Sequence, residues 1–224
     1  MSAALDADVF AVVVAVRRAD EAKTRLAGAL SADARRALVH AMLDDVLAAA
    51  RRAHGGALYV LTPDDAYAAT AARYEATLLP DAGRGFNIAV CAAVGHAALR
   101  DAPGALILPV DIPQVRSDDL RSVLAALAAP DAQVVLVPSA DGGTAALGLR
   151  PPSVMAPHFG IDSAAAHRAT ARAAGLTLRE LSPPSLAADI DTPADLAAVR
   201  DRVGPATGAV LATLPAGWPD GPAR

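Results

Sequence analysis

The chain has 224 residues, of which 54% are apolar and 20% charged, so it can bury a continuous core and is not expected to be disordered. Its 20 Lys and Arg residues against 24 Asp and Glu residues give a net charge of −4, and only 3% of the residues are aromatic. These values argue against nucleic-acid binding, which relies on basic surfaces and aromatic stacking platforms.

Cellular location is indicated by three features of the sequence. The single cysteine, Cys91, cannot form an internal disulfide, which favours a reducing compartment. The first residues are acidic and lack the pattern of a signal peptide, and no uncharged stretch is long enough to cross a bilayer. We therefore expect a soluble, cytoplasmic protein that does not associate with membranes.

Strand and helix patterns alternate along the chain, starting with residues 9–16, a continuous apolar run typical of a strand buried on both faces. Further strands are predicted at 58–62, 76–79, 105–109, 133–137, 144–149 and 177–181. Helices are predicted at 32–53, 64–73, 86–99, 117–128, 163–174 and 192–203. This alternation predicts an α/β fold with a mostly parallel sheet, in one domain over residues 1–203. The Pro- and Gly-rich residues 204–224 are expected to form a loosely held tail.

Basic residues gather in the loop after the first predicted strand, where Arg17, Lys23 and Arg25 fall within nine residues. Ligands of open α/β sheets bind beyond the carboxyl ends of the strands, so these cations are placed to meet a triphosphate. The loop has neither the P-loop motif nor the dinucleotide-binding glycine motif. A solvated surface loop is the alternative interpretation.

Three aspartates are candidates for holding a divalent metal ion. Asp111 directly follows an apolar strand, and Asp189 and Asp191 are two residues apart, so on an extended segment they point to the same side. Two carboxylates placed this close repel each other unless a cation joins them. The alternatives are that Asp111 is a turn residue and that Asp191 caps the helix that follows it.

Two further segments contain groups that can hold an anion. Thr144 follows two glycines between two predicted strands, which is either an ordinary hairpin turn or a close backbone approach to a ligand. Gly160 and Ser163 precede and open the next helix, where Ser163 is either a plain N-cap or part of an anion site.

Together these segments resemble the guanylyltransferases of deazaflavin coenzyme (F-420) biosynthesis, the CofC family. Its members transfer GMP from GTP to 2-phospholactate or phosphoenolpyruvate, and variants use 3-phosphoglycerate. The resemblance runs from about residue 9 to residue 203. The matching residues are Arg17 in place of a family lysine, residues 23–26, Asp81, Gly85, Asn87, Pro109, Asp111, Pro113, Pro138, Ser139, residues 141–144, Phe159, Gly160, Ser163, His167 and residues 189–193.

This resemblance implies a Rossmann-like nucleotidyltransferase fold with a mixed, mostly parallel sheet, of the nucleotide-diphospho-sugar transferase kind. It implies roles for named residues. By this resemblance, Mg²⁺ is expected to be held by Asp111, Asp189 and Asp191, and the phosphorylated three-carbon acid by Thr144, Gly160 and Ser163. The nucleotide is expected to be bound by Arg17, Lys23, Arg25, Gly85 and Asn87. The catalytic residues are expected to be Asp111, Lys23 and Arg25. His167 is interpreted as a structural histidine.

The sequence departs from the family pattern near the expected acid pocket. Ala145 stands where an asparagine is common, Phe86 replaces a usual leucine, Ala166 replaces a frequent arginine, and Cys91 lies on the helix that flanks the cleft. The identity of the acid therefore stays open. The sequence also leaves open whether one metal ion or two are bound and what the oligomeric state is, a homodimer being one option. The product is expected to pass to the next enzyme of the pathway.

The expected reaction is an in-line displacement at the α-phosphorus of GTP with release of pyrophosphate. Because a phosphate acceptor is already ionised at neutral pH, no strong general base is needed, and alignment and charge neutralisation carry the rate. Two other functions remain open. One is a nucleotidyltransferase of the sugar-phosphate or molybdopterin type, and the other is a non-catalytic nucleotide-binding regulator.

Overall fold

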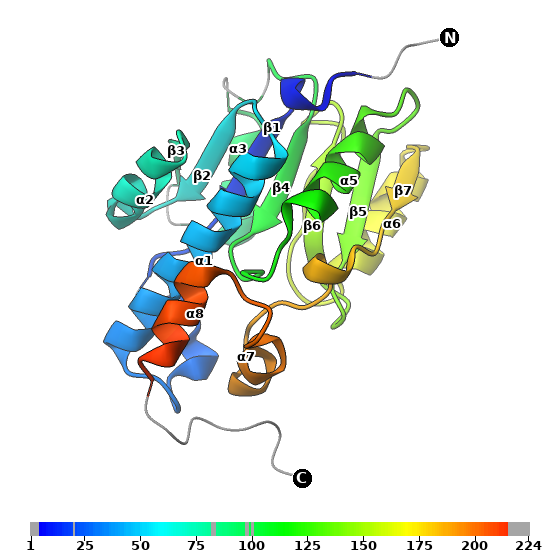
Figure 1. Cartoon of the computed structure of the whole chain (residues 1–224). Helices are drawn as coiled ribbons and strands as arrows, with labels where there is room; N and C mark the ends of the chain where they lie inside the picture. Colours follow the sequence, from blue (N-terminus) through cyan, green and yellow to red (C-terminus); the bar gives the residue numbers. More distant parts are fainter. Residues whose placement is uncertain (1–4, 20, 82–83, 97–98, 100, 215–224) are drawn as a thin grey trace.

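Seven strands form one mixed sheet in the order β3-β2-β1-β4-β6-β5-β7 in the computed structural model, which describes residues 5–19, 21–81, 84–96, 99 and 101–214 (Figure 1). The strands are β1 (Ala11–Ala15), β2 (Leu58–Thr62), β3 (Thr77–Pro80), β4 (Ala105–Pro109), β5 (Val134–Pro138), β6 (Thr144–Leu149) and β7 (Leu178–Glu180). All neighbouring strands are parallel except those paired with β6, which runs antiparallel to β4 and β5. The predicted α/β fold with a mostly parallel mixed sheet is confirmed.

Helices cover both faces of the sheet. One face carries α1 (Ala32–Ala53), α5 (Ser117–Ala128) and α8 (Pro205–Ala212), and the other carries α3 (Phe86–Val94) and α6 (Ser163–Ala173) (Figure 1). Successive side chains of β1 alternate between these layers: Val12 and Val14 join the first core, and Val13 joins the second. Both faces of β1 are therefore buried, which accounts for its unbroken apolar sequence.

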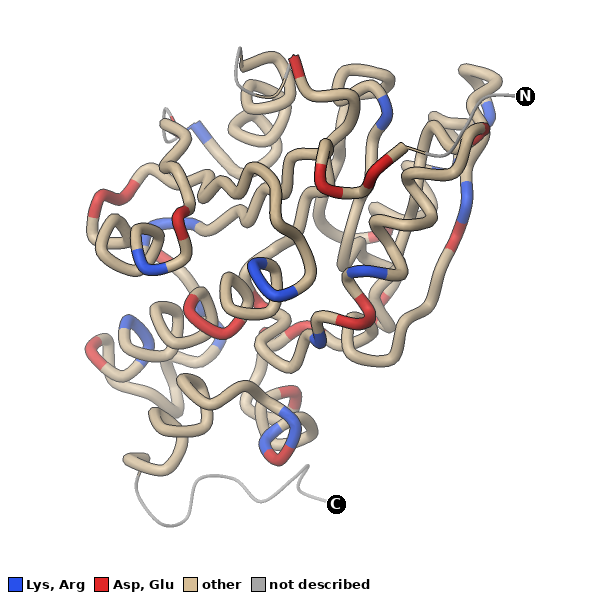
Figure 2. The backbone as a smooth tube through the Cα atoms, turned by 45° about the horizontal axis from the view of Figure 1, so that its top comes forward, with Lys and Arg blue, Asp and Glu red and all other residues tan. Residues whose placement is uncertain are grey.

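Shorter helices complete the fold: α2 (Ala68–Arg73), α7 (Pro193–Val199) and the 3-10 turns η1 (Ala7–Val9), η2 (Thr24–Leu26), η3 (Asp65–Tyr67) and η4 (Pro184–Leu186). Predicted helices 86–99 and 192–203 end earlier than expected, at Val94 and Val199. Lys and Arg residues lie interspersed with Asp and Glu residues along the backbone (Figure 2). No helix in the described part of the chain combines the length and apolar character needed to cross a membrane.

The antiparallel strand β6 places its first residue, Thr144, at the edge of the sheet where β4 and β5 end. The connection from β5 to β6 spans only residues 139–143, too short for a parallel crossover. A Cβ atom at Gly143 would lie 2.7 Å from Oγ of Ser139, so a larger residue there would displace the hydroxyl that donates to Asp141. The hairpin interpretation of the paired glycines is thus correct, and the hairpin brings Thr144 to the edge where ligands bind in α/β sheets.

The expected loose tail is wrong for residues 205–212, which form helix α8. Pro205 occupies the first turn of the helix, and the backbone N–H groups of Ala206 and Thr207 donate to the Asp45 carboxylate of α1 at 3.0 and 2.8 Å. Leu211 is buried in the core beside α1. A buried carboxylate cap and an apolar contact thus hold this segment, while residues 215–224 of the tail lie outside the described residues.

Candidate active site

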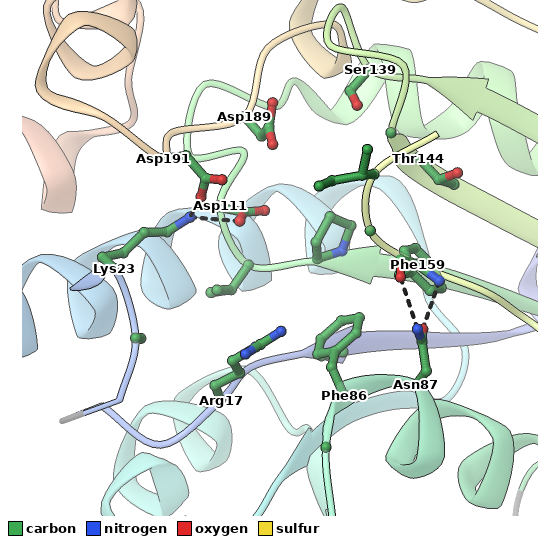
Figure 3. A pocket seen from close by; sticks show the side chains of 18 of the residues that line it. Arg17, Lys23, Phe86, Asn87, Asp111, Ser139, Thr144, Phe159, Asp189 and Asp191 are labelled. Atoms are coloured by element: carbon green, nitrogen blue, oxygen red, sulfur yellow. Dashed lines mark hydrogen bonds and ion pairs between the residues drawn. The ribbon is translucent and has the colours of Figure 1, made fainter. Parts of the chain in front are cut away.

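A pocket of about 680 Å³ opens at the carboxyl ends of β1 and β4 and the amino end of β6 (Figure 3). It brings together ten of the eleven residues predicted from the sequence: Arg17, Lys23, Arg25, Gly85, Asn87, Asp111, Thr144, Gly160, Asp189 and Asp191. Ser163 does not line the pocket and is fully buried behind Thr144.

Three carboxylates form the acidic part of the pocket. Asp111 lies just beyond β4, and the Ile190 N–H donates to the Asp111 carbonyl at 2.9 Å, which ties segment 189–191 to this strand end. Ile190 is fully buried, so Asp189 and Asp191 on either side of it project into the pocket as predicted. Oxygen atoms of the three carboxylates lie within 4.8 Å of one another, a spacing that suits a shared cation.

Asp191 is not the cap of helix α7, so that alternative is wrong. The N-cap is Thr192, which forms a reciprocal capping box with Asp195. Asp111, likewise, does not cap α5, whose N-cap position is Arg116. Neither carboxylate therefore has a helix-capping role that would explain its position.

The negative charge gathered in this cluster affects the pKa of Asp189. Burial, followed by the nearby carboxylates of Asp111, Asp141 and Asp191, raises the pKa of Asp189 to about 6. A hard divalent cation prefers a set of carboxylate oxygens and would relieve this repulsion. The donor set therefore fits a metal ion.

Lys23 already places a positive charge inside the cluster. Its Nζ lies 2.6 Å from Oδ2 of Asp111 and 2.9 Å from Oδ1 of Asp191, and only 6% of its side chain is exposed (Figure 3). Burial alone would lower the pKa of Lys23, but the two carboxylates outweigh it and raise that pKa. Arg25 bonds the other oxygen of Asp191 at 3.0 Å, with 66% of its side chain exposed.

Arg17 and Phe86 form the wall opposite the carboxylates (Figure 3). The Arg17 guanidinium lies 5.6 Å from the centre of the Phe86 ring, a cation–π distance, and Phe86 meets Phe159 edge to face. Gly85 has a positive φ of 110° and precedes α3 as its N-cap. This wall thus combines aromatic and basic side chains, in contrast to the acidic side.

Asn87 binds the backbone of the neighbouring loop. Its Nδ2 donates to the Phe159 carbonyl at 2.8 Å, and its Oδ1 accepts the Phe159 N–H at 2.6 Å. The side-chain amide therefore fixes the loop that carries Gly160, whose φ of +124° favours glycine. Asn87 lies at the expected place, but both ends of its amide are engaged within the protein.

A buried polar cluster lies behind Thr144. Its Oγ1 is 2.9 Å from Oγ of Ser163 and 3.1 Å from Nδ1 of His167, whose Nε2 accepts the His158 N–H at 2.9 Å. Burial lowers the pKa of His167 to about 4, so the imidazole is neutral at pH 7. His167 is a structural residue that contacts Thr144, in agreement with the sequence interpretation.

Several pocket residues were not predicted as site residues from the sequence: Glu21, Arg84, Phe86, Ile88, Ser139, Asp141, Phe159 and Ile161. Asp141 orders the β5–β6 turn by accepting from Ser139 Oγ and the Gly143 N–H, a pattern that its place two residues before Gly143 signals. Ile161 is 84% exposed at the pocket rim. Its place between Gly160 and Asp162, in a loop expected to bind a ligand, was the only sign in the sequence that it lines the pocket.

The sequence as a whole matches a family model described as guanylyl transferase CofC like, over residues 10–200. It is 42% identical over 204 residues to a phosphoenolpyruvate guanylyltransferase from Conexibacter woesei, covering 90% of this chain and 92% of that protein. It is 38% identical over 213 residues to a 3-phospho-D-glycerate guanylyltransferase from Phenylobacterium zucineum, covering 92% and 97% of the two chains.

The fold is also similar to that of a solved structure. A protein from Desulfovibrio desulfuricans, described as a nucleotide-diphospho-sugar transferase, superposes with a TM-score of 0.75. The alignment covers 92% of this chain and 94% of that one at 20% identity. At this identity the likeness concerns the fold alone, and it confirms the predicted nucleotidyltransferase type of sheet.

Proposed function

The chain belongs to the family of CofC-like guanylyl transferases, and we propose that it transfers GMP from GTP to a small phosphorylated carboxylic acid. The candidate acceptors are phosphoenolpyruvate and 3-phosphoglycerate, after the names of its relatives, and 2-phospholactate. The product would serve the biosynthesis of coenzyme F-420 and pass to the next enzyme of that pathway.

One observation carries this proposal: a single pocket holds three convergent carboxylates, a loop with cations and a hydroxyl-bearing turn. Nucleotidyl transfer needs these three kinds of group, because two phosphorylated molecules must be held together against their own negative charge. A pocket of about 680 Å³ has room for a nucleotide beside a three-carbon acid.

In the proposed reaction an oxygen of the acid's phosphate attacks the α-phosphorus of GTP. A new phosphorus–oxygen bond forms as the bond to the pyrophosphate oxygen breaks, and pyrophosphate leaves with the electron pair. Arg17, Lys23 and Arg25 bind the triphosphate and stabilise the charge on the departing pyrophosphate. No side chain has to remove a proton, since the attacking phosphate is already ionised at neutral pH.

Mg²⁺ is the proposed cofactor, held by Asp111, Asp189 and Asp191, and when bound it supplies positive charge to phosphate oxygens. The acid is proposed to bind at the Thr144 turn and the Gly160 loop, with Thr144 across the pocket from Lys23 (Figure 3). Ser163 would support this subsite from behind, through its contact with Thr144.

A pyrophosphate-release screen tests the proposal. The purified protein would be incubated with Mg²⁺, each of the four ribonucleoside triphosphates and, as acceptor, each of the three acids or a sugar phosphate, and the adduct would be identified by its mass. We expect pyrophosphate and a GMP–acid adduct with GTP. Release with a sugar phosphate instead would indicate another nucleotidyltransferase, and GTP binding without turnover would indicate a regulator.

A further inference from the structure

Lys23 is the single lysine among the 20 basic residues of the chain, and it lies where a metal ion would bind. Its ammonium contacts oxygens of two of the three clustered carboxylates, from a side chain that is almost completely buried. Arginine differs from lysine in this setting, because the ammonium is a compact point charge on a flexible stem. The resident cation of this cluster is therefore a movable side chain.

A divalent ion and the Lys23 ammonium cannot both occupy this position. Mg²⁺ binds carboxylate oxygens at about 2.1 Å, which would place it against an ammonium that bonds the same carboxylates. Like charges at this separation repel strongly in a partly buried site. The cluster also stays undercharged, since the Lys23 ammonium and the exposed Arg25 guanidinium together face three carboxylates.

A triphosphate gives Lys23 another partner. Lys23 lies in the loop between β1 and α1, next to Arg25 and in the same pocket as Arg17. GTP bound there would bring several negative charges within reach of the lysine stem. The side chain can then leave Asp111 and Asp191 for phosphate oxygens, which frees those carboxylates.

From this juxtaposition we infer that Lys23 is a built-in counter-ion that competes with the divalent metal in the nucleotide-free enzyme and moves to the triphosphate when GTP binds. Metal and GTP therefore bind cooperatively, because each removes an obstacle to the other. The inference rests on the proposed function, since it takes the metal and GTP from it.

The first test measures binding of Mn²⁺, as a probe for the metal, by electron paramagnetic resonance with and without GTP. In the wild type, free Mn²⁺ should bind weakly and GTP should tighten it. In Lys23→Met, the affinity for Mn²⁺ alone should be at least about tenfold higher than in the wild type, because one competing positive charge is lost. GTP should then increase the Mn²⁺ affinity of the variant by a smaller factor than in the wild type. Arg25→Met, which removes an exposed contact to the same cluster, is the matched control and should change free Mn²⁺ affinity less.

The second test needs no variant. Lysine labelled with ¹³C at Cε gives one side-chain resonance from the single Lys23, which should shift when Mg²⁺ is added and again when GTP follows. Free Mn²⁺ binding that is unchanged or weaker in Lys23→Met, with a Lys23 signal that does not respond to Mg²⁺, would overturn the inference. Wild-type protein that binds no Mn²⁺ even with GTP would contradict the proposed function instead.

Discussion

Oγ1 of Thr144 lies 3.1 Å from Nδ1 of His167, and the other ring nitrogen of His167 accepts the His158 N–H. Because Nε2 is an acceptor in the neutral ring, the ring proton must be on Nδ1 and be donated to Thr144. Oγ of the buried Ser163 lies 2.9 Å from the same oxygen of Thr144. The histidine thus orients a pocket hydroxyl without touching a ligand itself.

Protonation of His167 should destabilise the fold in acid. Its pKa is lowered to about 4, so its contribution to stability is complete above the unfolded value of 6.5 and is lost as the pH falls from 6.5 towards 4. At pH 5 this loss is about 2 kcal/mol. Urea unfolding at pH 7.5 and pH 5 should show that the wild type loses more stability than His167→Gln. Equal losses in both proteins would contradict this account.

Thr144→Val keeps the shape of the side chain and removes its hydroxyl. We expect the KM of the acid to rise about tenfold, as for one lost hydrogen bond near 1.4 kcal/mol, while the KM of GTP changes little. Ser163→Ala should act in the same direction through Thr144, with a smaller effect on the acid, since Ser163 does not line the pocket. Equal changes in both KM values for Thr144→Val would place the acid elsewhere.

Asp189→Asn and Asp191→Asn each remove one charge from the carboxylate cluster. Both variants should fold normally and lose turnover by about 100-fold or more, because the phosphates lose their charge stabilisation. Asp118→Asn changes an exposed carboxylate of α5 that pairs with Arg121, and it should keep its rate. Near-full rates for either cluster variant at limiting Mg²⁺ would rule out a shared ion.

Lys23→Ala and Arg25→Ala test the loop cations through GTP affinity, measured by calorimetry at low and high salt. Lys23→Ala should weaken GTP binding by about tenfold or more, as for a charge-assisted contact of about 1.5–3 kcal/mol, and reduce its salt dependence. Arg25→Ala should have a smaller effect, because its side chain is largely exposed and screened. Unchanged GTP affinity in both variants would show that these two cations do not bind the triphosphate.

Periodicity in the sequence sufficed for most of the fold. Helix 32–53 and strands 58–62 and 105–109 were predicted with the bounds that the structure shows, because their apolar patterns and caps are strong. Helix α8 was missed because it lies in a Pro- and Gly-rich part of the sequence, and its stability comes from a cap by Asp45, which is distant in the sequence. A tertiary contact of this kind leaves no local signal.

For the candidate site, the spacing of Asp189 and Asp191 around a buried isoleucine predicted their direction correctly. Pairing of Lys23 with Asp111 was not predicted, because 88 residues separate them and only the sheet topology brings them together. The sequence also did not indicate that the Asn87 side-chain amide would form hydrogen bonds with the Phe159 backbone. Such contacts depend on how neighbouring loops pack.

The most direct test of guanylyl transfer follows an isotope. Phosphoenolpyruvate or 3-phosphoglycerate carrying ¹⁸O in its phosphate would be incubated with GTP, Mg²⁺ and the enzyme. The products would then be separated and their masses measured by mass spectrometry. Attack by the acid's phosphate on the α-phosphorus predicts a GMP–acid adduct that retains all of the label, with unlabelled pyrophosphate. Labelled pyrophosphate, or free GMP without any adduct, would contradict the account.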